Sequence, residues 1–206
     1  MKFRLASSLF LAVCFLAVSG IPANAIDVLY NNGGGSEFLQ TWDISGSNMA
    51  SNQFTCSVGT CNTQILEFDA VRTQGTDATM VNWSVTSAPL AGGTTLASGT
   101  SALPQFYACD PDGVVCLFDI NFATSLSGGS YYLNLSGVDA PLGWATTSHP
   151  LNGTNAYSII NGVETDNIQG MGFKIEGTST PEPGSVLLFG SGVLGVSGML
   201  RRRFLS

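Results

Sequence analysis

Basic residues are scarce in this sequence, and their scarcity excludes several classes of partner. Of the 206 residues, 7 are Lys or Arg, 14 are Asp or Glu, and 1 is His. The two terminal segments hold five of the basic residues and one acidic residue, so the net charge of −7 becomes −11 for the body between them. A strongly acidic body repels the phosphates of nucleic acids and of anionic lipids. We therefore expect no nucleic-acid partner.

Histidine is nearly absent, so catalysis through an imidazole has a single candidate, His149. This residue precedes a proline in the segment SHPLNG, and the chain has no G-x-S-x-G motif of a nucleophilic serine. A catalytic triad can still assemble across a fold from distant residues. The simpler interpretation is an exposed loop histidine, and we predict that the protein is not an enzyme.

Helical periodicity is also missing between the two ends of the chain. The body instead alternates apolar and polar residues, as half-buried strands do, most clearly in TMVNWSVTS, CLFDINFA, SYYLNLSG and GMGFKIEG. Weaker strand candidates are DVLY, EFLQTWDI, NQFTCSV, QILEFDAV, TTLASGT and AYSII. Turn clusters such as NNGGGS, DPDG and SGGS lie between these stretches. The pattern predicts one all-β domain, residues 26–177, folded as an antiparallel β-sandwich with jelly-roll topology.

Cysteine is limited to five residues, and Cys14 lies in an apolar run that we expect to be removed. The other four are Cys56, Cys61, Cys109 and Cys116. An even number of cysteines in an exported chain indicates disulfides, for which three connectivities exist. The short spacings favour Cys56–Cys61 and Cys109–Cys116. A zinc site is the alternative, although zinc prefers closer pairs and a reducing compartment.

The N-terminus has the pattern of a secretory signal peptide. Two basic residues precede an apolar run from Leu9 to Val18, and Ala23 and Ala25 form a small-x-small cleavage site. We predict that residues 1–25 are a signal peptide, cut after Ala25.

The C-terminus has a second targeting pattern, within residues 178–206. Residues 184–200 are uncharged, and as a helix they would be about 25 Å long, nearly enough to span a bilayer. The cluster Arg201, Arg202 and Arg203 follows at once and is expected to stay on the cytoplasmic side. We predict a polar linker and then a single transmembrane helix, with the body outside.

The motif Pro181-Glu182-Pro183 precedes this helix, so motif, apolar helix and arginine cluster stand in fixed order. This order resembles the PEP-CTERM sorting signal of Gram-negative bacteria. The resemblance implies that an exosortase, an integral-membrane cysteine transpeptidase, recognises the tail and processes the protein near Pro-Glu-Pro. It also implies a transient stage at the inner membrane with the body in the periplasm, and then delivery to the cell surface or the extracellular matrix.

The middle of the chain resembles a recurring core of exported PEP-CTERM surface proteins. The resemblance rests on Trp83, the segment 97–99, Tyr131–Leu135 and Trp144. It implies a lectin-like sandwich and assigns no activity.

Two acids of the stretch LEFDAVR are candidates for glycoside hydrolysis, which needs paired carboxylates. Glu67 and Asp69 are two residues apart and therefore share one face of a strand. Some sandwich-fold glucanases have the strand motif E-x-D-x-x-E, but Arg72 occupies the position of its last acid. The alternative is that both acids face solvent while Leu66, Phe68 and Ala70 point inward.

Two further binding sites are considered. Asp110 and Asp112 in CDPDGVVC are weak candidates for calcium ligands, although two acids are too few for a full site and an ordinary Asx-Pro turn is the simpler alternative. No other cofactor is expected. Carbohydrate binding needs aromatic platforms, and Tyr132 and Trp144 are the main candidates, the latter because its Gly-rich surroundings suggest an exposed loop. Core packing or loop anchoring is the commoner alternative for such a residue.

These observations favour a non-enzymatic protein that is exported to the cell surface and associated with the exopolysaccharide matrix of a biofilm. Two alternatives stay open: a lectin-like carbohydrate-binding module and a glycan-active hydrolase.

Overall fold

The computed structural model describes residues 26–33, 40–72, 78–104, 109, 115–147 and 156–180. Several predicted features lie outside these residues. They are the signal peptide, the tail from Pro181 onward, Asp110, Asp112 and His149.

The described part of the chain is all-β, as the sequence predicts, and contains ten strands and no helix. The strands are β1 (Asp27–Asn31), β2 (Thr41–Asp43), β3 (Met49–Arg72), β4 (Met80–Thr86), β5 (Thr95–Ala102), β6 (Val115–Ser136), β7 (Leu142–Ala145), β8 (Ala156–Ile160), β9 (Val163–Ile168) and β10 (Phe173–Thr180). Within the described ranges, no helix is long and apolar enough to cross a membrane.

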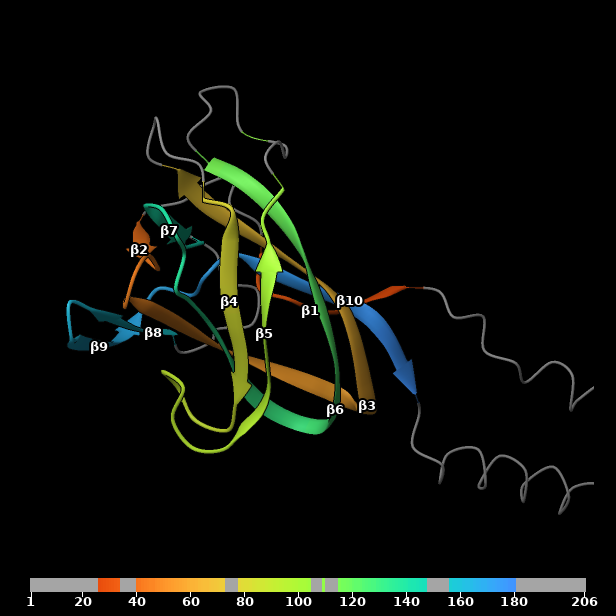
Figure 1. Ribbon diagram of the computed structural model, residues 1–206. Helices are drawn as coiled ribbons and strands as arrows, with labels where there is room; N and C mark the ends of the chain where they lie inside the picture. The colour runs from red at the N-terminus through yellow and green to blue at the C-terminus, as the bar shows by residue number, and fades with distance from the viewer. Residues whose placement is uncertain are drawn as a thin grey trace, which may run out of the picture.

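All the named strands pair in antiparallel fashion within one continuous sheet (Figure 1). Its main order is β1-β10-β3-β6-β4-β5, while β7 and β8 also pair with β3, β2 pairs with β7, and β9 pairs with β8. The centre is formed by the long strands β3 and β6, which have 24 and 22 residues. Their ladder runs from the pair Met49 and Ser136 to the pair Val71 and Val115.

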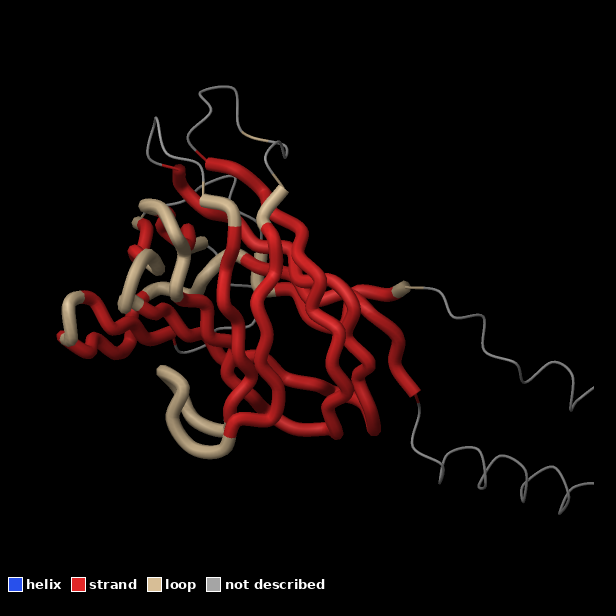
Figure 2. The backbone as a smooth tube through the Cα atoms, in the orientation of Figure 1, coloured by secondary structure: helices blue, strands red, loops and turns tan. Residues whose placement is uncertain are grey.

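Both long strands bend, and the bend folds the sheet over on itself (Figures 1 and 2). The first half-sheet contains β8, β9, β4 and β5 with residues 49–56 of β3 and 130–136 of β6. The second half-sheet contains β1, β10, β2 and β7 with residues 60–72 of β3 and 115–127 of β6. A strand that turns through a bulge in this way can belong to two packed layers.

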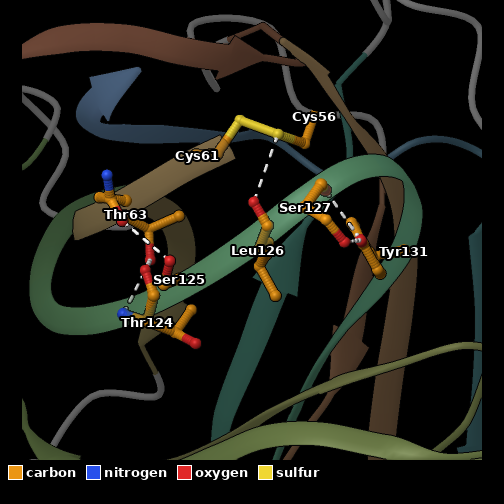
Figure 3. The surroundings of a disulfide bond; sticks show 9 residues. Cys56, Cys61, Thr63, Thr124, Ser125, Leu126, Ser127 and Tyr131 are labelled. Carbon is orange, nitrogen blue, oxygen red and sulfur yellow. Dashed lines mark hydrogen bonds between the residues drawn. A yellow bond between two sulfur atoms is a disulfide. The ribbon is translucent and has the colours of Figure 1, made fainter. Parts of the chain in front are cut away.

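The bend in β3 is closed by a disulfide. The β3–β6 register shifts between Cys56 and Thr60, and Cys56 is bonded to Cys61 across this interruption (Figure 3). The second register shift lies between Thr63 and Ile65, and there the Thr63 hydroxyl donates to the carbonyl of Phe122 at 2.5 Å. The bridge closes the interruption within β3, and this hydrogen bond links β3 to β6 where the regular ladder is broken.

The core lies between the two half-sheets. Trp83 of the first half meets Phe122 of the second with ring centroids 4.8 Å apart, and Phe54 meets Tyr30 at 6.0 Å. The alternating apolar residues of the four clear stretches are buried here, as predicted, except that Tyr131 is half-buried. A hydrogen bond also connects the two half-sheets: the Ser101 hydroxyl of β5 donates to the carbonyl of Asn121 in β6.

Two sequence-based boundaries are wrong. The cluster SGGS was expected to be a turn, but Ser127–Ser130 continue β6 through its bend. The sequence could not reveal this, because apolar residues alternate in the same way in one bent strand as in two separate strands. The domain was expected to end at residue 177, followed by a linker. Instead β10 continues to Thr180, which pairs with Thr60 of β3. Short β7 and β9 were not predicted at all.

Removing the bridge at the bend should lower stability. The double variant Cys56→Ser and Cys61→Ser frees a short loop, for which the loss of chain-entropy constraint is about 2 kcal/mol. Urea denaturation of the mature protein should show a lower midpoint with an unchanged slope. An unchanged midpoint would mean that the strand pairing alone holds the bend.

Candidate functional sites

The acids proposed for hydrolysis occupy different environments. Glu67 is partly exposed and forms an ion pair with Lys174, with 3.0 Å between carboxylate and ammonium, while Glu176 holds the same ammonium at 2.9 Å. Burial opposes the charge of Lys174, but its hydrogen bonds and attraction to Glu176 and Glu67 outweigh this and raise its pKa. Glu67 is therefore part of a surface charge cluster on β3 and β10.

Asp69 does not face solvent, contrary to the sequence-based alternative that placed both acids on the surface. It is only 7% exposed, because the segment around Gly172 crosses close to it. The amide of Asp69 donates to the carbonyl of Gly172 at 3.2 Å. The inward placement of Leu66, Phe68 and Ala70 is confirmed.

The register reveals a neighbour of Glu67 that sequence could not show. Asp119 of β6 lies directly opposite Glu67, so the two carboxyl groups share one face of the second half-sheet. Among the described residues, no three His, Cys, Asp or Glu side chains come together as a metal site.

Trp144 is not a surface residue, so the exposed loop that made it a carbohydrate-binding candidate is wrong and the core-packing alternative holds. It lies in β7 opposite Trp42 and has no exposed surface. Its ring packs against Phe68 and Phe173, at centroid distances of 6.4 and 5.7 Å. Its indole N–H donates to the carbonyl of Gly172 at 3.0 Å. The neighbouring glycine suggested a loop but belongs to the strand, so Trp144 is a core residue.

Tyr132 does lie on an outer surface, with a partner that the sequence did not indicate. Its ring forms an edge-to-face pair with Tyr157 of β8, with centroids 5.9 Å apart. Both side chains are half-buried and point away from the core. The pKa of Tyr132 is raised, first by burial and then by the charge and hydrogen bonding of Tyr157. The two phenols are therefore close enough to act as one site.

The residues paired with these tyrosines are polar and uncharged. Gln53, which is half-buried, and Thr86, which is buried, lie opposite Tyr132 on its two neighbouring strands, and the buried Ser51 lies opposite Tyr157. No charged residue occurs in the strand segments 49–56, 80–86, 130–136 or 156–160. The neighbouring strand β9 carries Glu164 and Asp166, so the acidic side chains of the first half-sheet's strands lie at the β9 edge and not on the strand segments that hold the ring pair.

A strained turn borders the same face. Leu90 and Ala91, between β4 and β5, have φ angles of 54° and 56°, which cost non-glycine residues about 1–2 kcal/mol each. The buried amide of Asn134 stabilises this turn, because its oxygen accepts from the amide of Ala91 at 3.1 Å. Its nitrogen donates to the Thr86 hydroxyl at 2.9 Å. Asn134 thus fixes the turn beside the strands that carry Tyr132.

The two ends of the domain meet at the disulfide-closed corner. Asp27 at the start of β1 pairs with Gly177 near the end of β10. Ser179 pairs with Cys61, so β10 ends beside the bridge. Figure 1 shows β1 and β10 side by side at this edge. The next residue, Pro181, begins the Pro-Glu-Pro motif.

Comparison with known families identifies the segment that follows. Residues 179–203 match the PEP-CTERM protein-sorting motif. No curated protein matches the chain. The protein is thus an exported protein whose described residues form an all-β domain, followed by a C-terminal sorting signal. That signal is the PEP-CTERM motif, and it marks the chain for recognition by an exosortase.

Proposed function

We propose that this chain is a non-enzymatic surface protein whose β domain is displayed in the exopolysaccharide matrix of a biofilm. The observation that carries the proposal is the sorting motif, whose match begins within the last two residues of the final strand of an antiparallel domain. The signal peptide takes the body across the inner membrane, the tail holds it there transiently, and the exosortase releases it to the surface. The folded sheet then serves as a lectin-like sandwich.

The aromatic pair Tyr132 and Tyr157, on strand segments without charged residues, favours carbohydrate binding as the means of matrix association. Aromatic rings pack against the C–H faces of sugars, while amides and hydroxyls bond their hydroxyl groups. Gln53 is placed beside the ring pair for such a contact. Because these strand segments carry no basic residue and the neighbouring β9 carries two acids, a neutral polysaccharide suits this face better than an acidic one.

Binding can be tested with the mature protein and polysaccharide extracted from the host's own matrix. Replacing Tyr132 or Tyr157 with alanine should weaken retention about tenfold, equivalent to about 1.4 kcal/mol. Val163→Ala, an exposed apolar change on β9, is the matched control and should have no effect. Equal retention of the tyrosine variants and the control would contradict this binding face.

The hydrolase alternative has less support. Glu67 is held in the ion pair with Lys174, and Asp69 is buried. The variant Glu67→Gln is expected to leave the polysaccharide unchanged in length, as the native protein does. If the native protein shortens the polysaccharide and Glu67→Gln does not, the non-enzymatic proposal fails.

A further inference from the structure

The sorting motif overlaps the folded domain. Its match begins at Ser179, but Ser179 and Thr180 are the last residues of β10 and are paired with Cys61 and Thr60 of β3. No spacer separates this strand from Pro181. In the folded domain, the first residues of the motif match are therefore part of the sheet.

A transpeptidase that acts near Pro-Glu-Pro needs access to the residues before the bond that it breaks. Enzymes and receptors bind such segments in extended form, often as an added strand. The four residues 177–180 span about 13 Å when extended. In the folded domain, one edge of this segment is already paired with residues 60–63 of β3, so that edge is not open to the enzyme.

The end of β10 is built differently from its beginning. Phe173 and Ile175 are 2% and 1% exposed and anchor the first part of the strand in the core. A register shift between Glu176 and Gly177 separates this part from the terminal segment Gly-Thr-Ser-Thr, which has no large apolar side chain. Beyond Gly177, β1 has no further pair, and among the described residues the strand partner of the end is β3.

The strand that β10 would leave behind is fixed independently. Cys61 is bonded to Cys56, and Thr63 exchanges hydrogen bonds with β6, donating to Phe122 and accepting from the amide of Thr124 at 3.1 Å (Figure 3). Residues 60–63 can thus keep their positions when β10 no longer covers them. Detachment of residues 177–180 breaks only their backbone pairing with residues 60–63, while the freed backbone regains conformational freedom.

We propose that residues 177–180 form a detachable strand end, which leaves β3 and binds to the exosortase in one extended segment with Pro-Glu-Pro. The inference rests on the proposed sorting and adds a recognition segment inside the domain. Residues before Gly177 stay in the sheet throughout.

The test uses two disulfide locks in the full-length chain, expressed in a host that makes the exosortase. Thr178→Cys with Asn62→Cys joins a pair in the detachable segment. Lys174→Cys with Glu67→Cys joins a pair in the anchored part and is the matched control. Intact masses of the exported chain give the processed fraction, and peptide mapping verifies each bridge.

The lock at residue 178 should lower the initial rate of processing at least tenfold, while the control lock leaves it unchanged. A four-residue Gly-Ser spacer inserted between Thr180 and Pro181 should restore processing of the lock at residue 178. Normal processing of that lock, or no rescue by the spacer, would overturn the proposal. If the native chain itself keeps its tail, the proposed sorting fails instead, so the two failures are distinguishable.

Discussion

Replacing Trp144 with alanine should lower the free energy of unfolding by about 3–5 kcal/mol, the usual cost of deleting a large buried aromatic side chain. The ring is fully buried and packs against Phe68 and Phe173. Its hydrogen bond to Gly172 also ties β7 to the segment before β10. Since a domain of this size is stable by about 5–15 kcal/mol, much of its stability would be lost.

Urea denaturation followed by circular dichroism measures this effect. Trp144→Phe keeps a ring and should lose less, whereas the surface variant Val163→Ala should be close to the native protein. A glycan-binding defect of Trp144→Ala would therefore reflect unfolding. If Trp144→Ala were as stable as the native protein, the burial of this residue would be wrong.

Replacing Arg201, Arg202 and Arg203 with serine should abolish most processing of the tail, with the tail-bearing chain accumulating in the membrane fraction. Three arginines strongly oppose passage through a bilayer and fix the chain end on the cytoplasmic side, so their loss removes the stop that positions the motif. The motif match extends to residue 203 and includes the cluster.

Intact masses from the membrane and matrix fractions give the result. The native chain should lose its tail near Pro181, and the variant should keep it. Replacing the three residues with lysine is the matched control, because lysine retains the charge, and it should preserve most of the processing. Normal surface delivery of the serine variant would contradict the sorting role of the cluster.

The sequence predicted the core well because alternation reports burial directly. Val81, Trp83 and Val85 face inward, as their spacing requires, and the two close cysteine pairs form the favoured bridges. The bend of β3 and β6 was not predictable from alternation, because the inward face keeps its period on both sides of the bend. The sorting signal was recognised from the order of its parts, which depends on no tertiary contact.

The surface sites were harder to predict because they depend on strand register. Tyr132 gains its partner Tyr157 through β8, and Glu67 gains Asp119 through β6, from positions far away in the chain. Trp144 was misplaced because a glycine beside it suggested a loop, whereas Gly143 lies in β7, where an added Cβ would come within 2.8 Å of Thr41. Local composition cannot distinguish such a close-packed strand from an exposed turn.

The long ladder between β3 and β6 also has a consequence for how quickly the domain folds. It joins residues as distant in the chain as Met49 and Ser136, and domains rich in such distant pairings fold slowly, on a scale of about milliseconds to seconds. The end of β10 can pair only after β3 is in place, and it is among the last parts of the chain to cross the membrane. Under the proposed sorting, folding and tail processing would compete, and an exosortase that acted early would meet residues 177–180 before they had paired with β3.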